Sequence, residues 1–356
     1  MASIIKKVSR RASHVIVSGI QPTGSLHIGN YLGFVKNFVK LQDSNTEAEK
    51  FLFVADLHSN SVKPKHENFR YQCRKLVASL IACGVNPSDT LLFYQSQVPE
   101  HAELAWHLGS VVTINRLSKL PQFREKSNED LDGVSPNLLT YPVLQAADIL
   151  LYKCTKIPVG EDQVMHVNLT FHIIEVLKGL FKKQCFPKPE LILSRSPRIK
   201  SLSDPAKKMS KSDPNQHAAV FLDDSEAQVL KKVKRAMTDS TGEKVRYDRE
   251  NRPGVCNLLE IVAELEEKTV EDVAQECSGL DSLGLKLRLA ELINETFRPI
   301  QRRMKEIEED EQYLDTVLVR NAEIARETAV NTLKEFKEII GYDQPQVYFN
   351  KLQGSG

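Results

Sequence analysis

The chain has 356 residues, of which 41% are hydrophobic and 27% are charged, and its formal net charge is +1. This composition is typical of a soluble globular protein, and the length predicts about two domains. No apolar run approaches the roughly 20 residues that cross a bilayer, so we predict no contact with a membrane. The six cysteines form no C-x-x-C pair, and no histidine stands at ligand spacing to them. We therefore expect no metal site built by the protein.

The N-terminal segment is basic and free of acidic residues. Residues 1–13 hold four basic side chains among serines, and no Asp or Glu occurs in the first 42 residues. Such a leader is typical of mitochondrial presequences and predicts a location in the matrix, whereas the alternative is a basic extension on a cytoplasmic or bacterial protein. At the other end, residues 343–356 finish in Gly-Ser-Gly, and we expect them to form a tail outside the fold.

A glycine-rich turn follows the first predicted strand. The apolar run 14–17 predicts a buried strand, and Tyr31 opens a stretch with apolar residues at helical spacing. Between them lie Gly19, Gly24 and Gly29. Glycine lets a backbone approach a ligand closely, and the free N–H groups at a helix start attract phosphate. The turn is a candidate phosphate site, although glycines alone favour a tight turn that binds nothing.

The following segments continue the alternation of strands and helices. Apolar runs at residues 50–58, 90–95 and 156–159 predict strands, and the amphipathic run 69–83 predicts a helix. This order indicates an α/β fold with a doubly wound parallel, Rossmann-like sheet. Ligands of such sheets bind at the carboxyl ends of the strands, where residues 160–163, Gly-Glu-Asp-Gln, are expected to lie.

From residue 218 the pattern changes to long helical periods rich in Glu, Lys, Leu and Ala. We predict an α/β domain over residues 14–217 and an all-helical domain over residues 218–342. Residues 258–340 contain 20 Asp and Glu against 11 Lys and Arg, a net charge of −9, so the remainder carries +10. The basic part is suited to a polyanion, and an ordinary solvated surface is the alternative.

A basic loop stands near the end of the predicted α/β domain. Residues 207–212 read Lys-Lys-Met-Ser-Lys-Ser between two Asp-Pro dipeptides, which favour turns. Three lysines and two hydroxyls can bind a polyphosphate, and a loop bounded by turns can move as charge develops on a leaving group. A basic loop by itself is most often solvated. Together with the glycine turn, it predicts a phosphate site.

One acidic side chain lies within an apolar helix. Thr140 is suited to cap the start of this helix. The residues that then share one helical face are Tyr141, Gln145, Asp148 and Tyr152. A carboxylate in apolar surroundings needs a partner, which for Asp148 is either a ligand or a neighbouring lysine or arginine.

These motifs resemble signatures of a known family. Residues 23–30, Thr-Gly-Ser-Leu-His-Ile-Gly-Asn, resemble the HIGH signature of class I aminoacyl-tRNA synthetases, and residues 208–212, Lys-Met-Ser-Lys-Ser, match their KMSKS signature. The chain further resembles the tryptophanyl-tRNA synthetases of bacterial and organellar type. The resemblance lies in Asn30, which stands in place of the second histidine of the signature, and in the segments 18–22, 139–148 and 158–163. The likeness extends from about Val15 to Gly341.

The resemblance implies a tryptophan–tRNA ligase, which forms tryptophanyl-adenylate and transfers the amino acid to tRNA(Trp). ATP with Mg²⁺ would be a co-substrate, and no permanently bound cofactor is expected. The implied partners are L-tryptophan, tRNA(Trp) and a second copy of the chain in a homodimer, with the anticodon bound by residues 218–342. The alternatives are a tyrosyl-tRNA synthetase, which would need a pocket for a phenolic O–H, a nucleotidyltransferase for a small metabolite, and a catalytically silent binding protein derived from a synthetase.

The resemblance also implies roles for particular residues. Catalytic roles fall on His27, Lys126, Lys208 and Lys211. Contacts to ATP fall on Gln21, Gly29, Asn30, Gly160, Asp162, Lys208, Met209, Ser210 and Lys211. Contacts to tryptophan fall on Val17, Gly19, Gln21, His58, Tyr141, Gln145, Asp148, Ile157 and Gln163, with Asp148 accepting the indole N–H. Val17 departs from the bacterial pattern, which usually has an aromatic residue there.

Overall fold

The computed structural model describes residues 14–22, 24–61, 68–127, 134–160, 163–193, 198–211, 213–239 and 242–342. The predicted leader 1–13, the ATP contact Asp162 and the tail 343–356 lie outside these ranges. Lys126 is described only by its backbone, which is helical.

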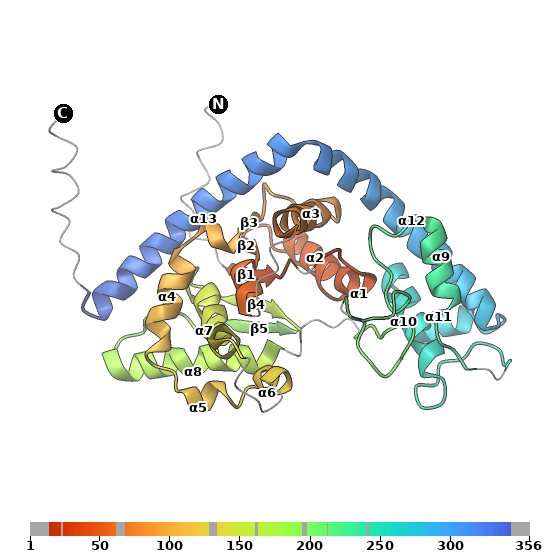
Figure 1. Ribbon diagram of the computed structural model, residues 1–356, viewed down its shortest axis with the longest axis horizontal. Helices are drawn as coiled ribbons and strands as arrows, with labels where there is room; N and C mark the ends of the chain where they lie inside the picture. The colour runs from red at the N-terminus through yellow and green to blue at the C-terminus, as the bar shows by residue number, and fades with distance from the viewer. Residues whose placement is uncertain are drawn as a thin grey trace.

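A five-stranded parallel sheet forms the centre of the N-terminal region (Figure 1). Its strands are β1 (Val15–Ile20), β2 (Glu49–Val54), β3 (Leu91–Tyr94), β4 (Lys156–Val159) and β5 (Glu190–Leu193), in the spatial order β3-β2-β1-β4-β5. The predicted doubly wound α/β fold is confirmed. The sequence did not reveal β5, because its four residues are partly exposed and give no longer apolar run.

The helices surround this sheet and continue beyond it. The α-helices are α1 (Ile28–Asn30), α2 (Lys36–Ser44), α3 (Phe69–Ala82), α4 (Glu100–Gly109), α5 (Ile114–Leu117), α6 (Pro121–Ser127), α7 (Pro136–Leu150), α8 (Val164–Phe181), α9 (Glu226–Lys234), α10 (Pro253–Glu266), α11 (Val270–Glu276), α12 (Ser282–Glu309) and α13 (Glu311–Ile339). A π-helix, η2 (Tyr31–Val35), joins α1 to α2, and short 3₁₀ helices are η3 (Leu57–Ser61) and η4 (Gln95–Gln97).

Helix α7 begins earlier than the sequence predicted. Ser135 caps it by accepting the N–H of Asn137 at 3.2 Å, and Pro136 occupies its first turn. The predicted cap Thr140 lies within the helix, where its hydroxyl donates to the carbonyl of Pro136 at 3.1 Å. The prediction was wrong because two Pro-containing segments, each suited to a helix start, follow one another, and the earlier one nucleates the helix.

The two faces of the sheet belong to separate hydrophobic clusters. Strand β2 alternates, so that Leu52 and Val54 face one cluster while Phe51 and Phe53 face the other. The first cluster continues through α2 and α3 into α9–α12. The second takes in α4, α7, α8 and the buried side chains of α13 from residue 322 to residue 336, whereas Leu314 and Leu318 at the start of α13 belong to the first. The helical C-terminal part therefore shares both cores with the sheet, and the predicted boundary at residue 217 does not separate two cores.

Helix α13 runs back from the C-terminal helices to the sheet, as the blue ribbon across the top of Figure 1 shows. It packs on β3 and α4. Arg326 of α13 pairs with Glu100 of α4 at 3.0 Å, and Lys337 pairs with Glu103 at 2.7 Å. Because β3 is an edge strand, this helix covers an edge that would otherwise be open to pairing.

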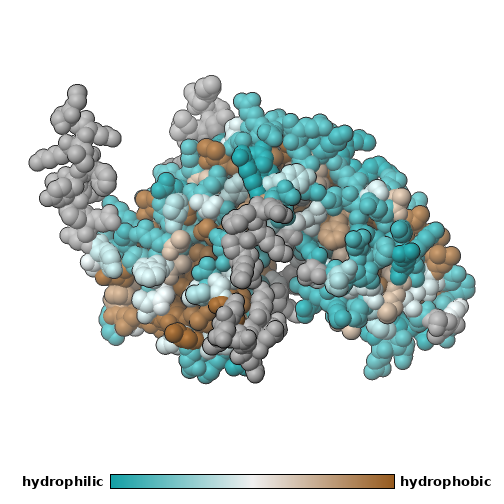
Figure 2. All heavy atoms as spheres, in the orientation of Figure 1, coloured by the Kyte–Doolittle hydropathy of each residue, from teal (hydrophilic) through white to brown (hydrophobic). Residues whose placement is uncertain are grey.

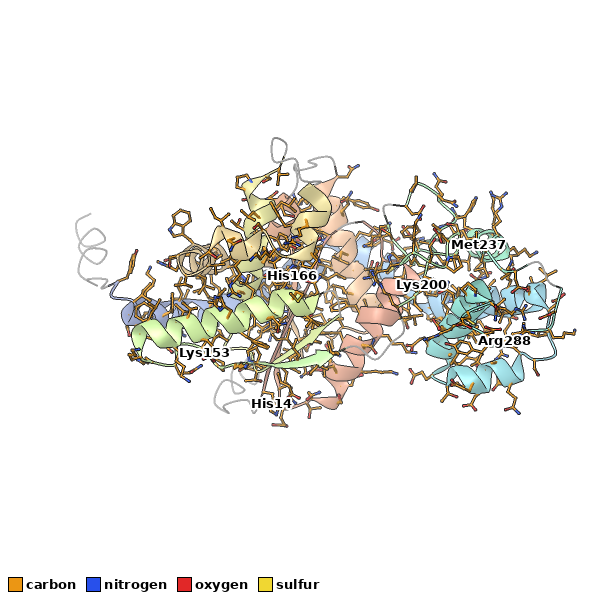
Figure 3. All side chains as sticks on the ribbon, turned by 90° about the horizontal axis from the view of Figure 1, so that it is seen from below. His14, Lys153, His166, Lys200, Met237 and Arg288 are labelled. Carbon is orange, nitrogen blue, oxygen red and sulfur yellow. The ribbon has the colours of Figure 1, made fainter. Side chains whose placement is uncertain are left out.

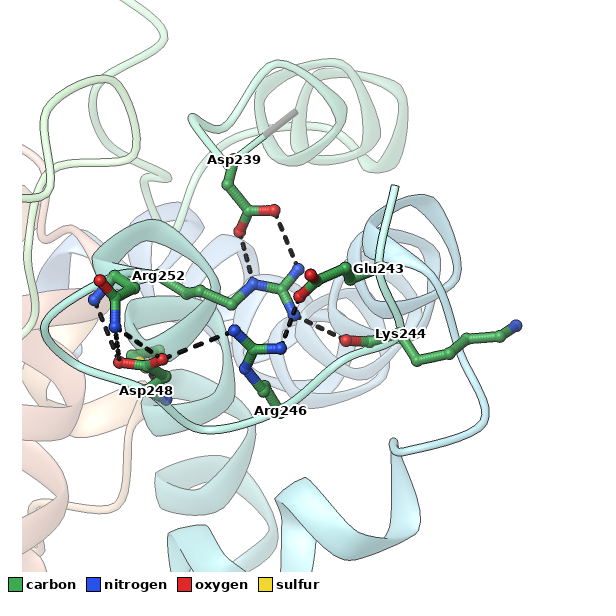
Figure 4. Close-up of polar contacts among 8 residues, drawn as sticks. Asp239, Glu243, Lys244, Arg246, Asp248 and Arg252 are labelled. Carbon is green, nitrogen blue, oxygen red and sulfur yellow. Dashed lines mark hydrogen bonds and ion pairs between the residues drawn. The ribbon is translucent and has the colours of Figure 1, made fainter. Parts of the chain in front are cut away.

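A buried arginine holds the loop between α9 and α10 (Figure 4). Arg252 bonds Asp239 through Nε at 2.7 Å and Nη2 at 3.0 Å, and its Nη1 donates to the carbonyl of Lys244 at 2.6 Å. A Cβ at Gly254 would lie 2.1 Å from the carbonyl oxygen of Met237, so only glycine permits this close approach. These contacts hold the described segments 235–239 and 242–252, which have no helix or strand of their own.

Helix α8 is long and apolar enough to cross a membrane by length and composition, with a mean hydropathy of 1.2. The buried residues on one side, among them Val167, Ile173 and Leu177, belong to the second cluster of the sheet. A core helix of this kind meets the same criterion.

Candidate active site

The strand order changes direction between β1 and β4. The chain adds β2 and β3 on one side of β1 and then returns to add β4 and β5 on the other. A doubly wound sheet binds its ligand at the carboxyl ends of the strands at this position. Gln21 directly follows β1, and Gly160 directly follows β4. Two predicted ATP contacts therefore lie at the edge where a nucleotide is expected.

His27 begins the helix that follows the glycine turn. Its Nδ1 accepts the N–H of Asn30 at 3.2 Å, and its own N–H donates to Oδ1 of Asn30 at 3.3 Å, so the two residues form a capping box. Because Nδ1 is an acceptor, the neutral ring carries its proton on Nε2. A Cβ at Gly29 would lie 3.0 Å from the His27 ring, which explains the glycine at this position.

The lysine loop is docked on the glycine turn. The ammonium of Lys211 donates to the carbonyl of Gly24 at 3.2 Å, although 187 residues separate the two. Met209 anchors the loop, since its side chain is buried in the core and its N–H donates to Ile199 at 3.1 Å. Lys208 is exposed and Ser210 is half-buried. The HIGH-type turn and the KMSKS-type loop thus meet in space.

The environment of this region changes the protonation of two residues. Burial, together with the charges of Lys211 and Lys208, lowers the pKa of His27 to about 3. The imidazole is therefore neutral throughout the physiological range. Burial also lowers the pKa of Lys211 to about 8, so this lysine keeps its charge at neutral pH and loses it in mild alkali.

Tyr141 and its neighbours form a polar network. The hydroxyl of Tyr141 donates to Oε1 of Gln122 at 2.6 Å and lies 3.0 Å from Nε2 of His166. His166, labelled in Figure 3, lies in the first turn of α8, and its Nδ1 is 3.0 Å from Oε1 of Gln163. Gln145 donates to the same oxygen at 3.3 Å. The structure thus brings together three predicted tryptophan contacts.

Asp148 is the centre of a second, fully buried network. It is 2% exposed, and its Oδ2 lies 2.8 Å from Nε2 of His58. Its Oδ1 accepts from Nε2 of Gln95 at 2.7 Å and lies 2.6 Å from Nδ1 of His101. Burial alone would raise the pKa of Asp148, but the hydrogen bonds from His101 and His58 outweigh it and lower the pKa to about 2. Asp148 is therefore a carboxylate held by imidazole and amide donors, with no lysine or arginine among its described partners.

Four polar residues of these networks were not predicted from the sequence: Gln95, His101, Gln122 and His166. Gln95 directly follows β3, so the rule that polar residues after a strand lie at the ligand edge would have found it. His101 lies inside α4, where a single histidine carries no signal. The Oε1 atom of Gln95 is buried and, within the described parts of the chain, has no hydrogen-bond partner.

Three further predicted tryptophan contacts are placed in or beside the strands. Val17 of β1 and Ile157 of β4 are 2% and 3% exposed and belong to the second core cluster. Gly19 faces the ring of Phe53, which a Cβ would approach to 2.4 Å. These residues can shape a pocket through packing. In the ranges that the structure describes, no group of three or more His, Cys, Asp or Glu is placed to hold a metal ion.

The sequence matches a known family over most of its length. Residues 9–298 match the model of the class I tRNA synthetases for tryptophan and tyrosine (W and Y). The mitochondrial tryptophan–tRNA ligase of Saccharomyces cerevisiae is 38% identical over 355 residues, which cover 94% of each chain. The chain therefore belongs to the class I tRNA synthetases and is an ATP-using aminoacyl-tRNA synthetase.

Two solved structures of tryptophan enzymes are similar to this chain over most of its length. The tryptophanyl-tRNA synthetase of Mycoplasma pneumoniae superimposes with a TM-score of 0.82 at 33% identity, over 92% of this chain and 98% of that one. The tryptophanyl-tRNA synthetase of Campylobacter jejuni, solved with ADP and tryptophan, gives a TM-score of 0.77 at 28% identity, over 92% of this chain and 99% of that one.

Proposed function

We infer that this chain is a tryptophan–tRNA ligase, which activates L-tryptophan with ATP and transfers it to tRNA(Trp). The observation that carries the choice of amino acid is the buried carboxylate of Asp148, beside which the Oε1 atom of Gln95 is an unpaired acceptor. The only strong donor of a tryptophan side chain is its indole N–H, and a buried carboxylate is a strong acceptor for it. A phenylalanine side chain has no donor, so the acceptor position that the indole N–H would occupy would stay unpaired, which costs about 1–3 kcal/mol.

The first reaction joins the amino acid to AMP. A carboxylate oxygen of tryptophan attacks the α-phosphorus of ATP, the bond from that phosphorus to the bridging oxygen breaks, and pyrophosphate leaves. A carboxylate needs no general base, so positioning and charge stabilisation supply the catalysis. We assign the leaving pyrophosphate to Lys211 and Lys208, and the Nε2–H of His27 to a phosphate oxygen. Mg²⁺ enters as the MgATP substrate.

ATP–pyrophosphate exchange tests this assignment directly. The purified chain should catalyse exchange with tryptophan and not with the other nineteen amino acids. Exchange with tyrosine instead would move the assignment to the tyrosyl enzymes, which share the fold. Absence of exchange with any amino acid would identify a catalytically silent relative.

We propose that the basic part of the chain binds the tRNA backbone, with the anticodon held by residues 218–342. The acidic stretch 258–340 carries −9, and four of its arginines are already paired. Arg288 pairs with Glu266 at 2.8 Å, Arg298 with Glu226 at 2.8 Å, Arg303 with Glu306 at 3.0 Å and Arg326 with Glu100 at 3.0 Å. Affinity for phosphates must then come mainly from the +10 remainder. Phosphate contacts release counterions, so aminoacylation should weaken log-linearly with salt, while pyrophosphate exchange changes much less. Equal salt slopes for the two reactions would refute this arrangement.

We also propose that a second copy of the chain covers an apolar surface made by α4, α5 and α8. Large apolar side chains are exposed there: Trp106 at 84%, Ile114 at 73%, Met165 at 51% and Leu180 at 60%. Figure 2 shows brown, hydrophobic atoms gathered over this part of the molecule. Such exposure is typical of an interface and unusual for a monomer.

The dimer can be followed through Trp106, which is the only tryptophan in the chain. Dilution of the protein without substrate should shift its fluorescence as the surface meets water, together with a loss of mass in light scattering. Met165→Glu should give a monomer, whereas Met237→Glu, an equally exposed methionine outside this surface, should leave the mass unchanged. A wild-type monomer at all concentrations would contradict the proposal.

We propose import into the mitochondrial matrix. The acid-free basic leader supports it, as does the similarity to a mitochondrial enzyme of yeast. Residues 1–25 fused to a fluorescent reporter should direct it to mitochondria. A diffuse cytosolic signal would count against import.

A further inference from the structure

His101 is a buried histidine with two hydrogen bonds and no exposure to solvent. Its Nδ1 lies 2.6 Å from Oδ1 of Asp148, and its Nε2 lies 2.7 Å from the hydroxyl of Tyr152. It comes from α4, whereas Asp148 lies near the end of α7 and Tyr152 follows that helix. The ring therefore links the carboxylate to a second buried group on the same segment of chain.

The chemistry of the three groups fixes the direction of these bonds. A carboxylate is only an acceptor, so Nδ1 of His101 carries the proton that is donated to Asp148. In the neutral ring Nε2 then accepts the O–H of Tyr152, a residue that is 1% exposed and whose ring stacks on Phe51 at 4.3 Å. The other tautomer would place a lone pair against the carboxylate. The Asp148 carboxylate thus sets the tautomer of His101, and the hydroxyl of Tyr152 holds the ring at its other nitrogen.

The held carboxylate offers one acceptor position to a ligand. Oδ1 of Asp148 already accepts hydrogen bonds from Gln95 and His101. Among the described residues, Oδ2 accepts one from His58 alone. Since each carboxylate oxygen can accept about two hydrogen bonds, the remaining position is on Oδ2. The unpaired Oε1 atom of Gln95, which also contacts Asp148 through its Nε2, is a second buried acceptor close by.

We propose that His101, oriented by Tyr152, is a positioning residue for amino-acid selection, because it holds Asp148 with Oδ2 directed to the indole N–H. This inference rests on the proposed function. His101 does not touch the substrate. Loss of His101 should therefore weaken the use of a substrate that donates a hydrogen bond from position 1 of the indole ring. A purely structural role in the fold would affect all amino-acid substrates equally.

The test compares tryptophan with β-(3-benzothienyl)-L-alanine, in which sulfur replaces the indole N–H. The measured quantity is the ratio of kcat/KM for the two amino acids in pyrophosphate exchange. A loss of folding or of ATP binding lowers both values and cancels in this ratio. Only a change at the acceptor of the N–H alters it.

His101→Phe keeps an aromatic ring and removes both hydrogen bonds. We expect the preference for tryptophan over the analogue to fall about tenfold, in the range found for groups in direct contact. The KM for ATP should stay unchanged. Tyr152→Phe removes only the hydroxyl and should lower the ratio less. His101→Asn carries an amide nitrogen close to the place of Nδ1 and should restore part of the ratio.

His107→Phe is the matched control. His107 lies on the same helix, and its ring contacts Phe336 and Tyr342 rather than Asp148. This variant should keep the wild-type ratio. If His101→Phe does not fold, Tyr152→Phe and His101→Asn carry the test.

The outcomes that would contradict the positioning role differ from those that would contradict the proposed function. An unchanged ratio in the folded variants at positions 101 and 152 would overturn the positioning role. So would an equal fall for His107→Phe. A wild-type protein that activates tryptophan and the analogue equally well would instead show that Asp148 does not accept the indole N–H, and one that activates neither would overturn the proposed function itself.

Discussion

The two ends of the candidate site are built in different ways. At the phosphate end, His27 and Asn30 bond each other within one turn of chain, and the charge comes from lysines that are exposed or partly exposed. At the indole end, Asp148 is fully buried and meets residues that are 90, 53 and 47 positions away in the sequence. The first end is suited to a charged, mobile leaving group. The second is suited to reading one hydrogen bond in a dry environment.

The largest effect is expected for Lys211→Ala. Loss of a charge that acts on the leaving group typically lowers kcat by about 10²–10³-fold. Because the lysine acts at the phosphate end, the dissociation constant for tryptophan should stay within about twofold, the usual sign of a contact made in the transition state. Single-turnover adenylate formation and equilibrium tryptophan binding measure the two quantities. A parallel loss in both would show that the loop acts in ground-state binding.

Asp148→Asn should affect the opposite end. A hydrogen bond to a charged group contributes about 1.5–3 kcal/mol, which corresponds to a fall of roughly 10- to 150-fold in kcat/KM for tryptophan. The KM for ATP should remain near its wild-type value. Discrimination against phenylalanine and tyrosine should weaken at the same time. A variant that retained this discrimination would show that Asp148 does not select the amino acid, and thermal unfolding would serve as the control for folding.

The pH dependence should distinguish the two ends further. Burial lowers the pKa of Lys211 to about 8, so kcat/KM for ATP should fall about tenfold for each pH unit above 8 as the ammonium loses its proton. Stability should change in the opposite direction, because the unfolded chain binds the proton up to about pH 10.5 and deprotonation removes the cost of the buried charge.

Two controls test this pH assignment. Lys211→Arg should abolish the alkaline limb, since a guanidinium stays charged. Between pH 5 and 7 the activity should show no titration of His27, because the pKa of its ring is lowered to about 3. An alkaline limb that persisted in the arginine variant would assign it to another group.

The smallest effect is expected from salt on the KM values of the activation step, in which tRNA takes no part. Exposed charges at the phosphate end are screened within about 10 Å at 0.1 M ionic strength, so raising the salt to 0.5 M should increase the KM for ATP roughly two- to threefold. The buried network around Asp148 is shielded, and the KM for tryptophan should not change. An equal increase in the KM values for ATP and tryptophan would show that the indole end is more open to solvent than the 2% exposure of Asp148 indicates.

The local motifs could be interpreted from sequence because their geometry is set within a few residues. The signature residues His27 and Asn30, the glycines of the turn and the apolar runs 14–17, 50–58, 90–95 and 156–159 each carry their own signal, and they led to the α/β fold, the predicted phosphate site and the family. The start of α7 at Pro136 was missed because two adjacent helix starts compete with one another. Strand β5 was missed as well, and none of its four residues is buried.

Other features were decided only by the tertiary structure. No local pattern distinguishes His101 from a surface histidine of an amphipathic helix, or shows that α13 returns to cover β3 and that its apolar face joins the core of the sheet. No local pattern predicts that Lys211 donates a hydrogen bond to the carbonyl of Gly24. Hydrogen-bonding capacity and helical period are local properties of a sequence, whereas the partner that satisfies a buried group is chosen by packing between elements far apart in the chain.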